Sequence, residues 1–449
     1  MVLAAAGRVS HVAITGAGAP AQRGIQIANS TGTFTIDDVR VSKLSNDGLV
    51  VSAPRAVVNV SNSSFTAISG SGIRVSGSGA TVNARTTQIA GTTGTAVNVT
   101  GNGATVSLTS GRISGTAGNA VVAAGAGARV TVDASRITGT TGSALVTTVS
   151  GTGAGISANA TVIDTTGNPA VAIRGTDSAV SLAATTIRNV AGTAVDVGGT
   201  NARLNMLNGS RIERITGDGI AVTGTGASAV VSGRSVITDV GGNGIRTTGG
   251  TVQFVNATIQ NVTGAGILAQ GVNGPAPPGG PTNAVWVQGG TIRNTGGDGI
   301  VAIDSNLRVE RLDPANRNSL ATTVANTGAF GIRTVADTLV PGGMRVLVDS
   351  ANISGVDVGI SAAANAGSAA APPTIELTAV NNTIRTNGGG TGVVASAVFD
   401  VFAGTALSRV NAVIANNTIT SNGGPGILLN TPGGPAQFVI PGAPVPIPA

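Results

Sequence analysis

The chain has 449 residues, no cysteine and a formal charge of +6, and 41% of its residues are hydrophobic while 2% are aromatic and 10% charged. The lack of cysteine excludes disulfides, thiolate nucleophiles and cysteine-ligated metals, and the apolar content excludes disorder by composition. The 25 basic residues are dispersed and have almost no aromatic neighbours, so the positive charge does not predict nucleic-acid binding.

A short apolar motif, Gly and small residues followed by Ile, Val or Leu, returns about every 24 residues along the chain. Its first large apolar residue recurs in equal steps of 24 from Ile25 to Leu145, and then in steps of 22 to 34 as far as Ile427. Such a period is typical of solenoids. It predicts a continuous array over residues 1–435 and a Pro-rich tail at 436–449, where proline lacks the amide donor that a strand ladder needs.

The residues of one repeat, 128–148, contain three short alternating segments separated by Gly, Ser and Thr. The segments centre on Val130 and Val132, on Ile137, and on Leu145. Alternating β-branched residues bounded by turn formers predict strands. Each repeat is therefore expected to contribute three strands and three turns.

Equivalent apolar positions also line up from one repeat to the next, which places each strand beside its counterpart in a parallel ladder. The fold class predicted is all-β, a single parallel solenoid of about 16 turns of about 24 residues, with longer turns towards the C-terminus. The column expected for the third strand begins with the following residues: Ile68, Ile89, Ile113 and Ile137.

Gly-Asp-Gly and Gly-Asn-Gly triplets precede the first strand of several turns, at 217–219, 242–244 and 297–299. A tight corner with positive φ explains glycine there, and Asp or Asn at such a corner can bond a neighbouring amide. The acidic members of this column also raise the question of calcium, but their equivalents are Ser, Thr and Asn, so the prediction is a role in the turn and no metal site. These acidic members are Asp47, Asp218 and Asp298.

Two segments near the C-terminus, 381–387 followed by 392–394 and 416–422 followed by 426–428, carry Asn-Asn-Thr-Ile, a further Asn and then Gly with two apolar residues. This pattern resembles the repeat of the right-handed parallel β-helix proteins of the pectin-lyase-like superfamily. The resemblance covers essentially the whole chain and implies the fold. It does not imply one function, because this fold hosts lyases, hydrolases, tailspikes, adhesins and inert stalks.

The resemblance implies that a polyuronate-cleaving enzyme would need clustered carboxylates and basic residues, and the sequence offers few. Asp37 and Asp38 are the one adjacent acidic pair, His11 is the single histidine and Lys43 the single lysine. Two glutamates flanked by arginines are expected to form solvated salt-bridge clusters. We therefore predict no catalytic, cofactor-binding or metal-binding residue. The flanked glutamates are Glu213, beside Arg211 and Arg214, and Glu310, beside Arg308 and Arg311.

Glycan binding has little aromatic support, since Trp286 is the single tryptophan and there is no tyrosine. Trp286 is expected either on the outer surface or, preferably, packed under the preceding insertion. Arg112 and Arg136 hold equivalent positions one turn apart, and Arg211 recurs further on. They could bond acidic ligands, although isolated surface arginines are usually solvated.

The longer C-terminal turns are expected to place their extra residues at one corner, after the Gly-Ile strand, and so to form a face for a protein or glycan partner. Neutral loop growth explains them equally well. These extra residues are 271–282, 304–320, 335–345, 361–374 and 396–409.

The ends carry no visible cap, which predicts either an excerpt of a longer β-helix or self-association end to end. No segment has the roughly 20 apolar residues of a membrane span, and the start lacks the basic region of a secretory signal. The predicted function is a non-enzymatic extracellular or cell-surface structural β-helix, a stalk or stacking filament subunit. The alternatives are a carbohydrate-active β-helix, either a lyase or a glycan binder, and an adhesin that uses the loops after residue 270.

Overall fold

The structure, a computed structural model, describes residues 1–16, 22–167, 169–271, 284–337, 343–364, 373–397, 409–422, 427–430 and 438–439. These residues contain no helix, and their strands form a parallel β-solenoid of about 14 turns, close to the 16 predicted. The chain divides into two compact units, residues 1–230 with 234–236 and residues 231–233 with 237–449. The expected continuity over 1–435 stays a prediction.

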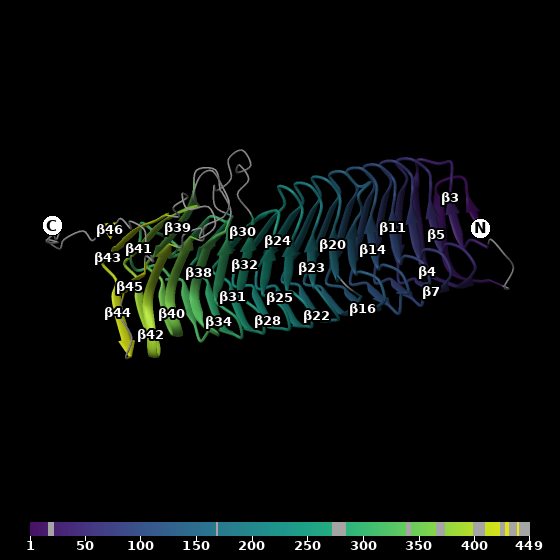
Figure 1. Cartoon of the computed structure of the whole chain (residues 1–449). Helices are drawn as coiled ribbons and strands as arrows, with labels where there is room; N and C mark the ends of the chain where they lie inside the picture. Colours follow the sequence, from purple (N-terminus) through teal and green to yellow (C-terminus); the bar gives the residue numbers. More distant parts are fainter. Residues whose placement is uncertain are drawn as a thin grey trace, which may run out of the picture. The chain divides into compact units, whose positions relative to one another are not determined.

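A regular turn has three strands, as the repeat predicted. Residues 128–148 form β15 (Arg129–Asp133), β16 (Arg136–Thr140) and β17 (Leu145–Thr147). Each strand pairs in parallel with its counterpart one turn away, as Figure 1 shows for the stacked strands from β5 to β23. We call the strands equivalent to β17, β15 and β16 the first, second and third strands of a turn.

In the N-terminal unit the first strands are short, and bends of two or three residues join the second strands to the third. The first strands are β1 (Val2–Leu3), β3 (Ile25–Ile27), β5 (Leu49–Val51), β8 (Ile73–Val75), β11 (Val97–Val99), β14 (Val121–Ala123), β17, β20 (Val171–Ile173), β23 (Val195–Val197) and β26 (Ile220–Val222). The second strands are β6 (Val57–Ser61), β9 (Thr81–Arg85), β12 (Thr105–Thr109), β15, β18 (Gly155–Asn159), β21 (Ala179–Ala183) and β24 (Arg203–Leu207). The third strands are β7 (Ser64–Ile68), β10 (Gln88–Ala90), β13 (Arg112–Ser114), β16, β19 (Val162–Thr166), β22 (Thr186–Val190) and β25 (Arg211–Ile215), while β2 (Gly7–Thr15) and β4 (Thr33–Leu44) run through both positions.

The C-terminal unit repeats this plan with longer connections. Its first strands are β29 (Ile245–Thr247), β32 (Ile267–Gln270), β35 (Ile300–Ile303), β38 (Phe330–Ala336) and β45 (Ile427–Asn430). Its second strands are β30 (Thr251–Val255), β33 (Val285–Gln288), β36 (Leu307–Glu310), β39 (Met344–Asp349), β41 (Thr374–Val380), β43 (Arg409–Ala415) and β46 (Phe438–Val439). Its third strands are β31 (Thr258–Val262), β34 (Thr291–Thr295), β37 (Thr323–Ala325) and β44 (Thr418–Asn422), β40 (Asn352–Ala364) and β42 (Thr383–Ala397) run from third to first position, and β27 (Ser228–Ser232) and β28 (Val236–Val240) contain residues of both units.

The predicted apolar columns form the core, with one correction. Ile89, Ile113 and Ile137 are paired in register on successive turns and are at most 2% exposed. The residue opposite Ile89 on the preceding turn is Phe65, however, and not Ile68. The period explains this, because 65 to 89 is a step of 24 whereas Ile68 lies three residues late and pairs with Leu44 instead.

Glycine precedes the first strand because of close approach rather than positive φ, which corrects the corner geometry predicted for it. A Cβ on Gly299 would lie 2.4 Å from Val324 Cγ1 and 2.5 Å from the Gly331 carbonyl oxygen, and Gly244 is equally confined. Neither has a left-handed φ. The left-handed residues lie elsewhere in the turn, for example Thr86 between β9 and β10 at φ 49° and Gly91 directly after β10 at φ 61°.

The insertions do not all fall at the predicted corner. Residues 304–306 are a short turn, and the extra residues 311–322 follow the second strand β36 instead of a first strand. In that loop the Leu312 amide donates to the Leu320 carbonyl at 2.8 Å. Most of 271–282 and 396–409, and parts of 335–345 and 361–374, lie outside the described residues, as does most of the predicted tail, where Phe438–Val439 form β46 and pair with β43.

Candidate functional site

The acidic pair near the N-terminus does not form one site. Asp37 accepts hydrogen bonds from Ser61 at 2.7 Å and Asn62 at 3.2 Å, and Arg8 pairs with it at 3.0 Å. These bonds, that of Ser61 foremost, hold the pKa of Asp37 below its ordinary value. Asp38 occupies a left-handed bend at φ 49° and lies 3.8 Å from His11, so the two carboxylates have different partners.

The acidic residues considered for calcium act at the corners. Asp47 Oδ1 accepts the Ser71 amide at 2.7 Å, and Asp298 Oδ1 accepts the Phe330 amide at 3.1 Å, in each case from the next turn. Asn119 does the same for Ser143 at 2.9 Å. Within the described residues no group of three or more His, Cys, Asp or Glu could hold a metal ion.

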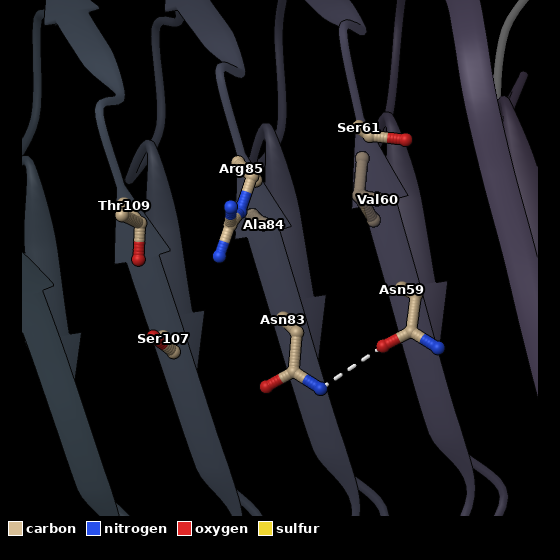
Figure 2. Close-up of a pocket in the computed structure, with 8 residues that line it drawn as sticks. All are labelled: Asn59, Val60, Ser61, Asn83, Ala84, Arg85, Ser107 and Thr109. Carbon is tan, nitrogen blue, oxygen red and sulfur yellow. Dashed lines mark hydrogen bonds between the residues drawn. The ribbon is translucent and has the colours of Figure 1, made fainter.

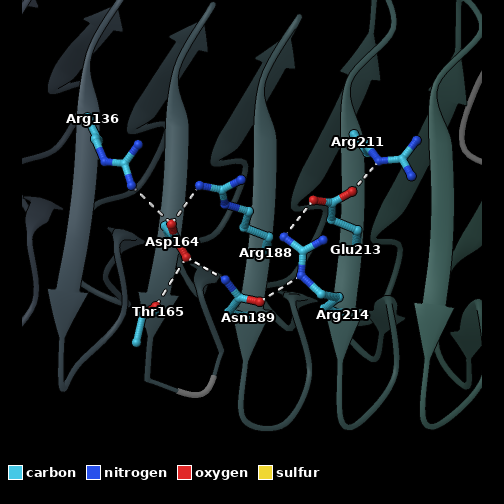
Figure 3. Close-up of polar contacts among 8 residues, drawn as sticks. All are labelled: Arg136, Asp164, Thr165, Arg188, Asn189, Arg211, Glu213 and Arg214. Carbon is cyan, nitrogen blue, oxygen red and sulfur yellow. Dashed lines mark hydrogen bonds and ion pairs between the residues drawn. The ribbon is translucent and has the colours of Figure 1, made fainter.

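A column of alternating charge lies on the outer side of three successive third strands (Figure 3). Asp164 on β19 is in register with Arg188 on β22, which is in register with Glu213 on β25. Asp164 and Glu213 are no more than 9% exposed. We call Asp164, Arg188 and Glu213 the charged ladder. The cluster predicted around Glu213 is thus present, but its carboxylate is buried and not solvated.

Arginines and an amide surround the charged ladder. Asp164 Oδ2 lies 2.8 Å from Arg188 and 3.1 Å from Arg136, and Asn189 donates to its Oδ1 at 2.7 Å. Burial alone would raise the pKa of Asp164, but the hydrogen bonds from Asn189, Arg188 and Thr165 outweigh burial and hold that pKa below its ordinary value.

Glu213 has a similar environment, with a different set of arginines. It pairs with Arg214 at 2.8 Å and also with Arg211. Arg214 in turn donates to Asn189 Oδ1 at 2.8 Å, so the two carboxylates share one network. Of the other predicted arginine pair, Arg112 lies one turn from Arg136 in exact register, as expected.

Trp286 lies on the outer side of β33, half-buried, where Glu310 of the next turn holds it. Glu310 is 2% exposed and accepts the indole N–H at 2.7 Å and the Gln288 amide at 3.0 Å. Arg308 pairs with Glu310 at 2.7 Å, and its guanidinium carbon lies 5.4 Å from the centre of the indole ring. Arg311 does not join this cluster, because it donates to backbone carbonyls of its own loop.

A polar hollow of about 400 Å³ lies on the outer side of the second strands β6, β9 and β12, and we call it the β6–β12 hollow. Figure 2 shows its side chains standing in rows across the three strands. The register of 24 residues produces one row of amides and hydroxyls and a second row that contains a guanidinium. The lining residues are Asn59, Val60, Ser61, Asn83, Ala84, Arg85, Ser107 and Thr109.

A second, smaller hollow of about 250 Å³ lies further along the same unit, on β15, β18 and β21. It also combines an arginine, Arg129, with hydroxyl side chains such as Ser157 and Ser181. Unlike Arg85, Arg129 is committed, since it donates to the Gly153 carbonyl of the next turn.

Neither the charged ladder nor the β6–β12 hollow was predicted from the sequence. A signal existed for both, because Asp164, Arg188 and Glu213 are separated by 24 and 25 residues, and Asn59, Asn83 and Ser107 by 24. Polar residues spaced by the period lie side by side on the outer surface just as apolar ones do inside.

Comparison with known proteins supports the fold and no further detail. No family model and no curated protein matches the chain. Among solved structures it is similar to Vag8 in its complex with C1 inhibitor, with a TM-score of 0.54, 14% identity and coverage of 94% of this chain and 99% of that one. In the part of the chain that the structure describes, no helix has the length and hydropathy to cross a membrane.

Two carbohydrate-active proteins are also similar. The catalytic domain of a GH87 α-1,3-glucanase in complex with nigerose matches with a TM-score of 0.31 and 12% identity, covering 93% of this chain and 64% of that one. The A-module of the Azotobacter vinelandii mannuronan C-5 epimerase AlgE4 matches with a TM-score of 0.24 and 10% identity, covering 97% and 91%. The likeness to these structures supports one conclusion, that the chain has a parallel β-helix fold.

Proposed function

We propose that this chain is a non-enzymatic extracellular β-solenoid that serves as a structural stalk at a cell surface. The main support is the environment of its buried outer carboxylates, since Asp164, Glu213 and Glu310 are each held by at least one arginine. A general acid, base or nucleophile must be able to reach a substrate in the appropriate protonation state. These carboxylates instead neutralise the arginines beside them.

Contacts between turns give the scaffold a second support. Corner residues such as Asp47 and Asn119 each bond an amide of the following turn. Stacked amides continue this pattern in the C-terminal unit, where Asn294 donates to Asn261 at 3.1 Å and Asn326 donates to Asn294 at 3.2 Å. Many polar side chains thus form hydrogen bonds between successive turns, which is what a structural stalk requires.

Self-association is a further part of this proposal. β2 pairs with β4 along one edge, and no described strand pairs with its other edge. An exposed edge presents unpaired backbone donors and acceptors to another chain. Electron microscopy and sedimentation of the purified protein at rising concentration should show chains of particles, and replacing Ala13 with proline, which removes a backbone donor from this unpaired edge, should shorten them. Particles that stay single at every concentration would contradict this part alone.

The non-enzymatic part is tested by screening acidic polysaccharides with and without calcium and measuring chain cleavage. We expect no turnover. If the wild-type protein cleaves a polysaccharide and Asp37→Asn or Asp38→Asn abolishes this cleavage, the proposal is overturned in favour of a carbohydrate-active solenoid. Asp177→Asn, which removes one exposed carboxylate elsewhere in the same unit, is the matched control.

A further inference from the structure

We propose that the peptide bond between Asp313 and Pro314 is a self-cleavage site, which the carboxylate of Asp313 itself breaks in mild acid. The bond lies in the loop of residues 311–322, between β36 and β37, and it joins the single Asp-Pro pair of the sequence. This chemistry goes beyond the structural function proposed above, because a stalk needs no break in its chain.

The loop keeps this bond in solvent and holds it in one conformation. Asp313 and Pro314 are both exposed. The backbone bond from Leu312 to Leu320 closes the base of the loop, and Arg311 donates to two carbonyls further along it. Water and protons therefore reach the bond while the groups around it stay in place.

The Asp313 carboxylate lies alongside the bond that it breaks. Its Oδ1 accepts the backbone N–H of Ala315, two residues further on, at 3.1 Å. A side chain that reaches this amide folds back along its own peptide bond, which brings the carboxylate near the Asp313 carbonyl carbon. Attack on that carbon closes a five-membered ring, and a nucleophile held beside its target reacts far faster than one free in solution.

The carbonyl that is attacked has two hydrogen-bond donors. The Asp313 carbonyl oxygen accepts the Asn316 backbone N–H at 3.0 Å and the Ser319 hydroxyl at 2.8 Å. Ser319 Oγ in turn accepts the Asp313 backbone N–H at 3.0 Å, so its own proton is left for the carbonyl oxygen. Two donors directed at an oxygen on which negative charge develops act as an oxyanion hole.

The reaction balances as a hydrolysis. A carboxylate oxygen of Asp313 bonds to the Asp313 carbonyl carbon, the bond from that carbon to the Pro314 nitrogen breaks, and the nitrogen takes a proton from the acidic solvent and leaves as an amine. Proline suits this role because its nitrogen carries a second alkyl group in place of a hydrogen. One water then opens the cyclic anhydride, which leaves a carboxyl group on the side chain and another at the new C-terminus.

The cut leaves the two pieces paired with each other. β36, before the cut, pairs with β39 after it, and β37, after the cut, pairs with β34 before it. The product is therefore a solenoid of two chains, residues 1–313 and 314–449. Gel filtration of the cut protein should give the elution volume of the uncut chain, and separation of the pieces would contradict this product.

The test is incubation of the purified full chain in mildly acidic buffer, with and without urea, followed by mass spectrometry. We expect fragments of residues 1–313 and 314–449, whose masses sum to that of the chain plus one water. The native chain should be cut at least about tenfold faster than the unfolded chain, since only the folded loop holds the carboxylate and the two donors in place. No cut, or equal rates in the two states, would overturn the proposal, because equal rates show only the ordinary acid lability of an Asp-Pro bond.

Variants identify the groups that act. Asp313→Glu keeps the charge but has to close a larger ring, so it should lower the native rate at least about tenfold. Ser319→Ala removes one donor to the carbonyl and should lower the rate about fivefold, whereas Ser319→Thr, which retains the hydroxyl, should keep it. The matched control is Ser157→Ala, at an exposed serine of β18, which should leave the rate unchanged.

Urea denaturation in the same buffer shows that each variant is folded. A wild-type rate in Asp313→Glu would overturn the role of the carboxylate and with it the proposal. A loss in Ser157→Ala as large as that in Ser319→Ala would overturn the assignment of the oxyanion hole to this loop.

Discussion

Asp164 on β19 and Arg188 on β22 occupy the same position on consecutive turns, and 2.8 Å separates the carboxylate Oδ2 from the guanidinium Nη2. In a parallel ladder a residue lies directly beside its counterpart one turn away, at about 4.8 Å between strands. Opposite charges placed one period apart are therefore neighbours and attract each other. A shift in the pairing register of the two strands would separate them. The charged ladder contributes to stability and to the correct stacking of turns.

Asp164→Asn should lower the free energy of unfolding by about 1–3 kcal/mol, as expected when hydrogen bonds to a buried charged group are weakened. Arg136 and Arg188 would keep their charges beside a neutral amide. Urea denaturation measures the change. Asp177→Asn is the control, because Asp177 is exposed and its Oδ1 bond from Asn201 survives in the amide, so it should change stability by less than about 0.5 kcal/mol. Equal losses in the two variants would contradict the role of the ladder.

The same carboxylate predicts a dependence on pH. Because the pKa of Asp164 is lowered in the folded state from its ordinary 3.8, the unfolded chain binds the proton more readily. The stability due to Asp164 is therefore fully present once the pH is about one unit or more above the unfolded-state pKa of 3.8. It is lost as the pH falls through the lower pKa of the folded state. Urea midpoints between pH 2 and 6 should fall less steeply for Asp164→Asn than for wild type. Parallel curves would show that Asp164 does not titrate differently on folding.

The strands and the side chains that face the core could be predicted well from the sequence. Strands β15, β16 and β17 coincide with the three segments inferred from residues 128–148, because alternation and turn residues determine both. The misplaced member, Ile68 instead of Phe65, shows the limit. The other members of this column are aliphatic, so the aromatic Phe65 was not assigned to it, although it lies 24 residues before Ile89 as the period requires.

The contacts among side chains on the outer surface were harder to predict. The Asn83–Asn59 bond follows from the period, and so does the alignment of Asp164 with Arg188, but these partners are found only when the period is applied to polar residues as well as to apolar ones. Burial of Glu310 could not be predicted, since it depends on Trp286 and Arg308 of neighbouring positions covering it together. The hollow depends on side-chain lengths in three adjacent turns.

The glycine before the first strand gives a third prediction. A Cβ on Gly72 would lie 2.5 Å from Ile89 Cγ2 and 2.8 Å from the Ala96 carbonyl oxygen, so Gly72→Ala should cost about 1–3 kcal/mol through overpacking. The comparison variant is Gly103→Asn. Gly103 has φ +63° and nothing within 4 Å of the position that a Cβ would take, and Asn tolerates this backbone, so the change should be below about 1 kcal/mol. A larger loss at Gly103, measured by urea denaturation, would mean that backbone conformation matters more than close approach.

Glu310 gives the last prediction, which the single tryptophan makes easy to follow. Glu310→Ala removes the acceptor of the Trp286 indole and the carboxylate that pairs with Arg308, so it should cost about 1–3 kcal/mol, the range for losing hydrogen bonds to a buried charged group. The freed indole should also meet more water, and its fluorescence emission should shift to longer wavelength before unfolding begins. Glu376→Ala, at an exposed glutamate of the same unit, should change neither quantity. Unchanged emission in Glu310→Ala would show that Trp286 is held by the indole packing alone and that the Glu310 bond contributes little to its position.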